Sequence, residues 1–370
     1  MKRFKKTLKI LIVNSIIFVI CLAIIEIIFG GWFNANRLNR LNMLKNCVLQ
    51  YEVSNLYNDQ IPIIKYSRDK YGLRGSYLNP GEIGILTVGG SATDQRFIRD
   101  GETWQDILQN NFQQAGLAIV VANAGIDGQS TYGHIKNFEW WFPGIPNLKP
   151  KYILFYIGLN DFYKEAGLEC DGLAHVRQSY NLEIKIRQNS ALWHMIRTIR
   201  GTYEAMFVEK IEHRFIDFSR QHWTDKAIQC NYDFMEKRLD EYANRLRILA
   251  DKTYAIGAKP IFVSQPSRRY QITPGGVRGQ DSVRFYDGHP YNGVDFYQMM
   301  RKLDNVTKSV AVEKGASFVD LASKPIWEDS DFYDFSHMTP EGAQKVGTLL
   351  YEALKNKCTD AEKTSPQDKK

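Results

Sequence analysis

The chain has 370 residues, of which 44% are hydrophobic and 24% are charged, and its formal net charge is +7. Five of these charges come from lysines and arginines among the first nine residues, so the remainder of the chain carries only +2. The composition is typical of a globular protein with a sizeable core. The sequence has no dense basic stripe, and we therefore predict no nucleic-acid partner.

The first element is an apolar segment, Leu8–Phe29, behind a basic tail. About 22 residues are enough to cross a hydrocarbon core roughly 30 Å thick. A cleaved signal peptide is the alternative, but its apolar region would be shorter and would end in small residues, and no such site follows here. We predict that residues 1–32 are a cytoplasmic tail and an uncleaved anchor in the inner or cytoplasmic membrane. The basic tail then places the rest of the chain in the periplasm or outside the cell.

The chain beyond the anchor divides into three parts by composition. Residues 33–80 are polar and irregular, and we interpret them as a stalk and a cover segment. Residues 81–357 contain a regular alternation of apolar and amphipathic segments, and they form the predicted main domain. Residues 358–370 are polar and are predicted to be a disordered tail.

Short apolar runs in the main domain alternate with helical patterns. The runs are rich in Ile, Val, Phe and Tyr and predict buried parallel strands at 83–90, 118–125, 151–160, 258–266 and 316–323. Helices are predicted at 103–114, 134–141, 232–256 and 296–314, and a last one starts near Pro340, with Thr339 as its N-cap. This alternation predicts an α/β fold, with helices on both faces of a mostly parallel five-stranded sheet.

A long stretch at about 162–229 interrupts the alternation after the third strand. It contains LWHMIRTIRGTYEAMF, which indicates a helical insertion. Cys170 and Cys230 bracket this insertion, so a disulfide between them would close it onto its base. The four cysteines outside the anchor allow three complete connectivities in an oxidising compartment. No CxxC pair and no Cys/His cluster suggests zinc, and we predict neither a metal nor a cofactor.

Polar residues follow several of the predicted strands. Ser91 follows the first, and Asn160 and Asp161 follow the third, while Asp334 stands three residues before His337, just ahead of the last helix. Parallel α/β sheets bind ligands beyond the carboxyl ends of their strands. A serine, a histidine and an acid on one face, with glycines nearby, form the constellation that acyl transfer needs.

Four blocks in this order resemble the SGNH hydrolases, also called the GDSL lipase/esterase family. They are Gly-Gly-Ser-Ala-Thr around Ser91, Asn-Ala-Gly-Ile-Asp-Gly ending at Gly128, Gly-Leu-Asn-Asp around Asn160, and Asp-Phe-Ser-His ending at His337. The usual Gly-Asp-Ser-Leu of the family is Gly-Gly-Ser-Ala here, which puts the substrate class in doubt more than the activity. The resemblance covers roughly residues 83–354 and implies a three-layer αβα, flavodoxin-like sandwich.

The resemblance also implies the roles of individual residues. Ser91 would be the nucleophile, His337 the general base and acid, and Asp334 the group that holds the histidine tautomer. The N–H groups of Ser91 and Gly128 and the side-chain amide of Asn160 would form the oxyanion hole.

Further interpretations concern the substrate. His289 and Asp161 are candidates for substrate contacts, and His134 is interpreted as an exposed helix residue. Tryptophans lie near the four blocks and would suit sugar rings, although each is individually more typical of a core: Trp104, Trp140, Trp141 and Trp327.

The sequence thus predicts a serine esterase that removes an acyl group, most simply O-acetyl, from a polysaccharide or another ester outside the cytoplasm. An acyltransferase that acts on envelope glycan is an alternative with the same triad. A catalytically inactive protein for glycan binding or envelope assembly is another. The sequence points to no particular protein partner.

Overall fold

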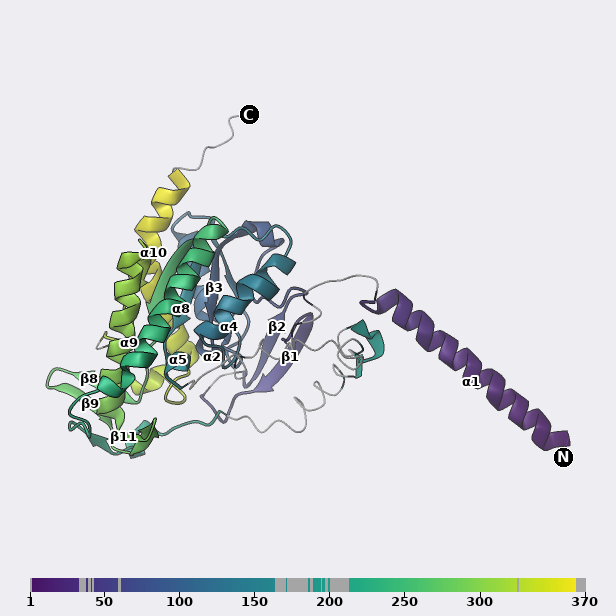
Figure 1. Ribbon diagram of the computed structural model, residues 1–370, viewed down its shortest axis with the longest axis horizontal. Helices are drawn as coiled ribbons and strands as arrows, with labels where there is room; N and C mark the ends of the chain where they lie inside the picture. The colour runs from purple at the N-terminus through teal and green to yellow at the C-terminus, as the bar shows by residue number, and fades with distance from the viewer. Residues whose placement is uncertain are drawn as a thin grey trace. The chain divides into compact units, whose positions relative to one another are not determined.

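A computed structural model gives the structure of the protein (Figure 1). It describes residues 2–32, 38, 41, 43–58, 61–163, 171, 186, 189–193, 195–196, 199, 213–324 and 326–363. The chain divides into two compact units. One comprises Met1–Leu41 and Val176–Lys210, and the other comprises Asn42–His175 and Ile211–Lys370. Each unit is described by itself.

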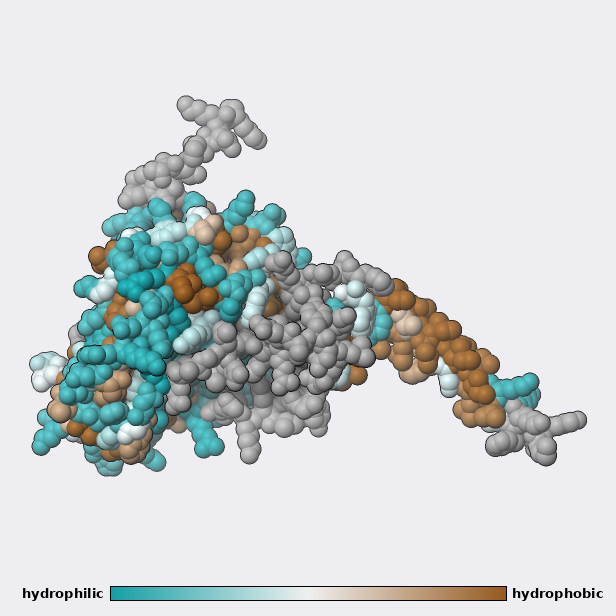
Figure 2. Space-filling model, viewed as in Figure 1, coloured by the Kyte–Doolittle hydropathy of each residue, from teal (hydrophilic) through white to brown (hydrophobic). Residues whose placement is uncertain are grey.

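The smaller unit contains α1 (Lys2–Phe29), the one helix in the described residues that is long and apolar enough to cross a membrane. Its apolar side chains are exposed, and Figure 2 shows them as a continuous brown surface. Length and composition alone fit either a membrane span or a signal sequence.

Glu26 of α1 has hydrogen-bond partners within this unit. Its carboxylate accepts hydrogen bonds from the backbone N–H groups of Ala191 (3.0 Å) and Leu192 (3.2 Å), and from the hydroxyl of Ser190. The indole N–H of Trp32 also donates to it, at 2.8 Å. Glu26 therefore caps the helical stretch that starts at Ala191.

The larger unit is built on a parallel sheet of five strands. The strands are β3 (Ile83–Gly89), β4 (Val120–Asn123), β5 (Tyr152–Ile157), β7 (Lys259–Ser264) and β12 (Ser317–Val319). Their order is β12-β7-β5-β3-β4, with every neighbouring pair parallel. All five predicted strands are confirmed. The order reverses between β3 and β5, which makes the carboxyl ends of these two strands the switch point of a flavodoxin-like sheet.

Helices cover both faces of the sheet (Figure 1). On one face α3 (Trp104–Gln114) packs against α10 (Pro340–Lys363), because the residues of α3 at 104, 108 and 112 are fully buried on one side. On the other, α8 (Glu236–Ala255) contacts α4 (Thr131–Lys136) and α9 (Gly293–Glu313). The three-layer arrangement that the sequence predicts is confirmed.

The end of α10 differs from the prediction. A disordered tail was expected from Cys358 onward, but α10 continues to Lys363. Cys358 is only 2% exposed and belongs to the main hydrophobic core. The polar composition of residues 358–370 suggested disorder, but Cys358 makes a further apolar contact on the buried face of α10.

Three small antiparallel sheets were not predicted. They are the hairpin of β1 (Cys47–Glu52) and β2 (Ile63–Arg68), the sheet of β6 (Trp223–Thr224), β9 (Gly276–Gln280) and β8 (Tyr270–Thr273), and the hairpin of β10 (Arg284–Tyr286) and β11 (His289–Tyr291). Residues 213–229, expected in the helical insertion, instead contain β6 and a short 3₁₀ turn, Phe218–Arg220. Cys170 lies outside the described residues and Cys230 is exposed, so the disulfide stays a prediction.

Candidate active site

The turn after β3 carries Ser91 at the start of a short helix, α2 (Ser91–Asp94). The glycines around it are required by close contacts. A Cβ atom on Gly90 would lie 1.9 Å from Nδ2 of Asn160, and one on Gly125 would lie 2.3 Å from the backbone nitrogen of Asp94. Gly90 therefore lets the asparagine amide approach the serine turn, and Gly125 lets the loop after β4 pack on α2.

Ser91, His337 and Asp334 lie together, as the sequence predicts. Oγ of Ser91 is 2.7 Å from Nε2 of His337, and Nδ1 of His337 is 2.7 Å from Oδ2 of Asp334. A tight loop before α10 sets this geometry, because the N–H of Tyr333 donates to the carbonyl of His337. Within that loop Oδ1 of Asp334 accepts hydrogen bonds from the backbone N–H groups of Ser336 and His337, both at 2.8 Å.

The Asp334 carboxyl is held in its ionised form. Burial alone would raise its pKa, but the hydrogen bonds from the His337 ring and from the two backbone N–H groups outweigh burial and lower the pKa. An ionised carboxylate accepts a proton-bearing Nδ1. Nε2 of His337 is then the acceptor that faces the Ser91 hydroxyl.

The three predicted oxyanion donors lie at or just after the ends of neighbouring strands, and their role stays a prediction. The Ser91 N–H is the first of α2. Gly128 lies in the loop after β4 with φ +68°, in the left-handed region that suits glycine. Asn160 is in α5 (Leu159–Tyr163), after β5, and donates one Nδ2 hydrogen to the carbonyl of Gln129 at 2.8 Å. Its amide has a second hydrogen, so one N–H remains to bind an oxyanion.

His134 supports Asn160 indirectly, through Gln129. The prediction that His134 is exposed is wrong. The ring is 1% exposed and its Nδ1 lies 3.0 Å from Oε1 of Gln129, the residue whose carbonyl holds Asn160. Because a side-chain carbonyl only accepts, Nδ1 of His134 carries the proton. Burial lowers the pKa of His134 to about 3, so the ring is neutral.

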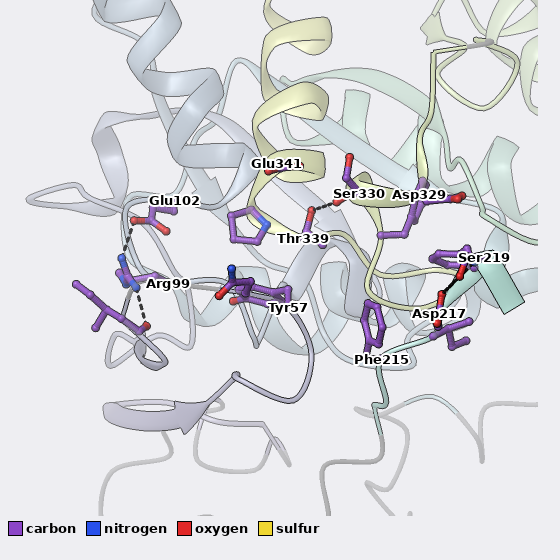
Figure 3. A pocket seen from close by; sticks show the side chains of 16 residues that line it. Tyr57, Arg99, Glu102, Phe215, Asp217, Ser219, Asp329, Ser330, Thr339 and Glu341 are labelled. Atoms are coloured by element: carbon purple, nitrogen blue, oxygen red, sulfur yellow. Dashed lines mark hydrogen bonds and ion pairs between the residues drawn. The ribbon is translucent and has the colours of Figure 1, made fainter.

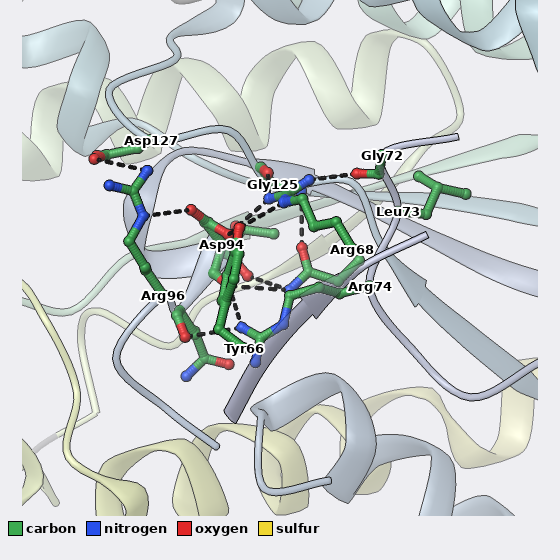
Figure 4. A network of polar contacts seen from close by, with 12 residues as sticks. Tyr66, Arg68, Gly72, Leu73, Arg74, Asp94, Arg96, Gly125 and Asp127 are labelled. Carbon is green, nitrogen blue, oxygen red and sulfur yellow. Dashed lines mark hydrogen bonds and ion pairs between the residues drawn. The ribbon is translucent and has the colours of Figure 1, made fainter. Parts of the chain in front are cut away.

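An ion-pair network anchors the other side of α2 (Figure 4). Asp94 is 2% exposed and lies 2.6 Å from Nη2 of Arg68, which comes from β2. Tyr66 donates to the same carboxylate at 2.8 Å, and Arg96 approaches it from the surface at 3.7 Å. Burial would raise the pKa of Asp94, but the nearby guanidinium groups of Arg68, Arg96 and Arg74 lower it.

The sequence offered little indication of this network, because the residues that contact Asp94 come largely from residues 33–80, which were interpreted as a stalk and cover segment. Arg74 donates to the backbone carbonyls of Asp94 (2.7 Å) and Gln95 (2.8 Å). Tyr66 and Arg68 of β2, together with Arg74 after it, thus hold the helix that presents Ser91. The only signal in the sequence was an acid three residues after the serine.

His213 was also missed, and it lies directly against the triad. Its ring centroid is 4.1 Å from that of His337, with the planes tilted by 36°, and its Nδ1 is 2.8 Å from the hydroxyl of Tyr333. Burial and the neighbouring His337 lower its pKa to about 4. His213, Asp334 and His337 place ligand atoms within 4.8 Å of one another. Both ring nitrogens of His337 are already engaged, Nδ1 by Asp334 and Nε2 by Ser91, so this ring has no free lone pair for a metal ion.

Other predicted contacts are not supported. The side chain of Asp161 is 1% exposed and is engaged by the hydroxyl of Thr131 and by Arg245 at 3.4 Å, so its role is structural and the predicted substrate contact is wrong. Trp104 and Trp141 are fully buried and belong to the core. His289 is exposed and stacks on Phe234 at 4.1 Å, and its proposed substrate contact remains a prediction.

A family model described as the GDSL-like Lipase/Acylhydrolase family matches residues 87–345. The match begins within β3 and ends within α10. It includes Ser91, Asp334 and His337, which we call the Ser91 cluster. Fold, site and match define a serine ester hydrolase. The chain belongs to the GDSL-like lipase/acylhydrolase family.

Solved structures of similar fold include a protein of the G-D-S-L family from Desulfitobacterium hafniense DCB-2. It is 13% identical, with a TM-score of 0.39, and the alignment covers 73% of this chain and 98% of that one. An acetyl xylan esterase from Geobacillus stearothermophilus is 17% identical, with a TM-score of 0.41 and coverage of 75% and 96%. No curated protein matches the sequence.

Proposed function

We propose that the protein hydrolyses an O-acyl ester on a polysaccharide outside the cytoplasm, with Ser91 as nucleophile. The observation that carries this proposal is the hydrogen-bonded series from Ser91 Oγ through His337 to Asp334, with 2.7 Å at each step. In the first half-reaction Ser91 Oγ attacks the acyl carbonyl and its proton passes to Nε2 of His337. The tetrahedral intermediate then collapses, and the sugar oxygen leaves with that proton.

The second half-reaction reverses the roles. Nε2 of His337 takes a proton from water, the resulting hydroxide attacks the acyl-serine, and Ser91 recovers its proton as the carboxylic acid departs. Asp334 stays ionised throughout and stabilises the imidazolium form of His337. The N–H groups of Ser91 and Gly128 and the free amide hydrogen of Asn160 receive the negative charge of the carbonyl oxygen in both intermediates.

The substrate assignment rests on location and on the small residue beside the nucleophile. A domain carried by an N-terminal membrane anchor and exported from the cytoplasm meets glycans more readily than metabolites. Ala92 next to Ser91 is compatible with a short acyl group, and O-acetyl is the simplest one. We also propose that the basic N-terminal tail stays in the cytoplasm, as the positive-inside rule predicts.

The test compares hydrolysis of p-nitrophenyl acetate, octanoate and palmitate by the full-length protein in detergent, followed by acetate release from O-acetylated glycans of the host envelope. We expect the acetate ester to be preferred and the glycan to lose acetate, with Ser91→Ala inactive on both. A preference for palmitate would contradict the short-acyl proposal. Transfer of the acetyl group to an added sugar, with no free acetate, would identify an acyltransferase.

A further inference from the structure

The loop between β7 and β8, residues 265–269, contacts two parts of the active site. Its first residue, Gln265, lies beside the end of β5, because the last residues of β5 and β7 are paired in the sheet. The backbone N–H of Leu159 donates to Oε1 of Gln265 at 3.1 Å, and Gln265 is only 5% exposed. Leu159 is the first residue of α5, so the glutamine caps the short helix that carries Asn160.

The same β7–β8 loop also contacts the loop that carries Asp334 and His337. The hydroxyl of Ser267 donates to the carbonyl of Phe335 at 2.7 Å, and the backbone N–H of Arg268 donates to the same carbonyl at 2.9 Å. Both donors belong to buried residues, and Phe335 directly follows the triad acid in the chain. Because a carbonyl oxygen has two lone pairs, both are engaged here, and the peptide plane next to Asp334 is fixed.

Arg269 joins the same two parts a second time. Its Nε donates to the hydroxyl of Tyr163, the last residue of α5, at 2.8 Å, and its guanidinium carbon lies 4.7 Å from the ring centroid of Phe335. Among the described residues no hydrogen bond runs directly between α5 and residues 333–338. The β7–β8 loop is therefore what connects the helix of Asn160 to the loop of His337.

The stems of the His337 loop border a cavity of about 780 Å³, with Ser330 and Thr339 in its lining (Figure 3). The hydroxyl of Thr339 donates to the carbonyl of Ser330 at 2.6 Å and ties the two stems together. Atoms that face a cavity have fewer packing contacts on that side. The position of the tip of the loop therefore depends more strongly on the two hydrogen bonds to Phe335.

The separation of Asn160 and His337 matters for the proposed chemistry. An oxyanion donor is effective when it lies about 2.7–3.1 Å from the oxygen that becomes charged. A displacement of about 1 Å can lower the rate by about 100-fold. Asn160 acts on the carbonyl oxygen of the ester, whereas His337 acts on the nucleophile and the leaving group. A segment that holds both residues fixes the distance between these two actions.

We propose that Gln265 and Ser267 are positioning residues for ester hydrolysis. Gln265 acts on the predicted oxyanion donor Asn160 through the start of α5, and Ser267 acts on His337 through the loop that carries it. Neither side chain has a printed contact with the Ser91 cluster, so each acts through another residue. The inference rests on the proposed function for the reaction whose rate these residues affect.

The first experiment measures hydrolysis of p-nitrophenyl acetate by the full-length protein in detergent. Gln265→Met removes the acceptor and is expected to lower kcat by about tenfold, because a misplaced oxyanion donor loses part of its effect. Ser267→Ala leaves the carbonyl with one donor and should lower kcat by about threefold to tenfold. KM should change by less than about twofold, since substrate binding is not altered. Gln265→Glu and Ser267→Thr keep the acceptor and the donor, and should restore most of kcat.

Two control variants remove buried hydrogen bonds of the same kinds elsewhere in the domain. In Gln109→Met, Oε1 no longer accepts the N–H of Val121, a bond of 2.8 Å. In Thr253→Val, the hydroxyl that donates to the carbonyl of Leu249 at 2.7 Å is lost. Both controls should keep parental kcat, even where urea unfolding shows that they are destabilised as much as the test variants.

A second readout does not require activity. The proton on Nδ1 of His337 that is shared with Asp334 lies in a short, charge-assisted hydrogen bond and resonates far downfield in proton NMR spectra, and its loss in His337→Ala assigns it. We expect this resonance to move or broaden in Ser267→Ala and to be retained in Ser267→Thr and Thr253→Val.

The proposal is overturned if Gln265→Met or Ser267→Ala keeps parental kcat, or if Ser267→Ala leaves the resonance of His337 unchanged. It is also overturned if the conservative variants or the controls are as slow as the test variants. A parent protein that hydrolyses no ester, but whose resonance changes as expected, would contradict the esterase proposal alone.

Discussion

Nε2 of His337 lies 2.7 Å from Oγ of Ser91, although 246 positions separate the two residues in the chain. Ser91 stands at the end of β3 and His337 just before α10. The helices α10 and α3 pack against each other and share a hydrophobic core with β3, and this packing brings the two ends together. The hydrogen bond between Ser91 and His337 therefore depends on the correct packing of the whole domain.

Substitution of the three clustered residues tests this relationship. Ser91→Ala and His337→Ala are expected to abolish hydrolysis of p-nitrophenyl acetate. Asp334→Asn should retain more activity than either, with kcat lowered by about 10³- to 10⁴-fold, because it disturbs the tautomer of His337 without removing the base. Circular dichroism of each variant checks that it is folded. Parental activity in Ser91→Ala would remove the proposed mechanism.

His213 offers a test of ring stacking beside the base. His213→Ala should lower kcat by about threefold to tenfold with little change in KM, since an aromatic pair contributes roughly 0.5–1.5 kcal/mol beyond its burial. His213→Phe keeps a flat ring over His337 and should restore most of kcat. A phenylalanine variant as slow as the alanine variant would show that the nitrogens of His213, and not its ring face, are what matters.

The buried pair of Arg68 and Asp94 is expected to be essential for stability. Arg68→Ala removes the nearest cation from the Asp94 carboxylate, which is 2% exposed and then faces Arg96 at 3.7 Å, and removing one partner of a buried pair typically costs about 3–5 kcal/mol. Activity should fall with stability, because the pair holds α2. Arg247→Ala breaks an exposed pair with Glu313 and is the control, with an expected cost of under about 1 kcal/mol. Urea unfolding of both variants measures the difference, and equal midpoints would contradict the role of the pair.

Stability should decline in mild acid because His134 is buried in its neutral form. The folded ring has a pKa of about 3, whereas the unfolded ring takes up a proton near its ordinary value of 6.5. The contribution is therefore complete above pH 6.5 and decreases by about 1.4 kcal/mol per pH unit below it, until the folded ring also titrates. His213, whose pKa is also lowered, acts with the same sign.

His134→Asn removes this titration while it retains an N–H near Oε1 of Gln129. The free energy of unfolding of this variant, measured between pH 6 and pH 4.5, should depend less steeply on pH than that of the parent. Identical slopes in the two proteins would indicate that His134 is protonated in the folded state.

The orientation of the chain is open to a fusion experiment. A reporter that is active only outside the cytoplasm, placed after Lys370, should be active if the basic tail before Leu8 stays inside. A second reporter that works only in the cytoplasm serves as the converse control. Activity of the cytoplasmic reporter would contradict the proposed location, and with it the expected disulfide.

Periodicity and short motifs were enough to predict the main sheet and the Ser91 cluster. The strands are continuous apolar runs, and Ser91, Asn160 and His337 directly follow or precede predicted elements. The small hairpins were missed because their strands are short and partly exposed, as in β10, so no clean alternation marks them. Burial was also misjudged for His134 and Asp161, polar residues of types that are often found at the surface, and for Cys358, which lies in a polar stretch of the sequence.

His213 and Arg68 illustrate the same limit at the site. Nothing in the sequence around either residue resembles a motif, and each acquires its role from a contact made by the folded chain. Their partners, His337 and Asp94, are 124 and 26 positions away. Tertiary packing, rather than local pattern, selects such supporting residues.

Glu26 links α1 to a stretch of chain 165 positions further along the sequence. Its carboxylate leaves the ribosome about 160 residues before Ser190, Ala191 and Leu192, and it is solvated until their N–H and hydroxyl groups arrive. A soluble form of the protein that starts after Trp32 would leave these donors without their acceptor, and the helical start at Ala191 would fray. α1 thus supplies a cap to a stretch of chain far from it in the sequence, and a chain that starts after Trp32 is not equivalent to the full-length one.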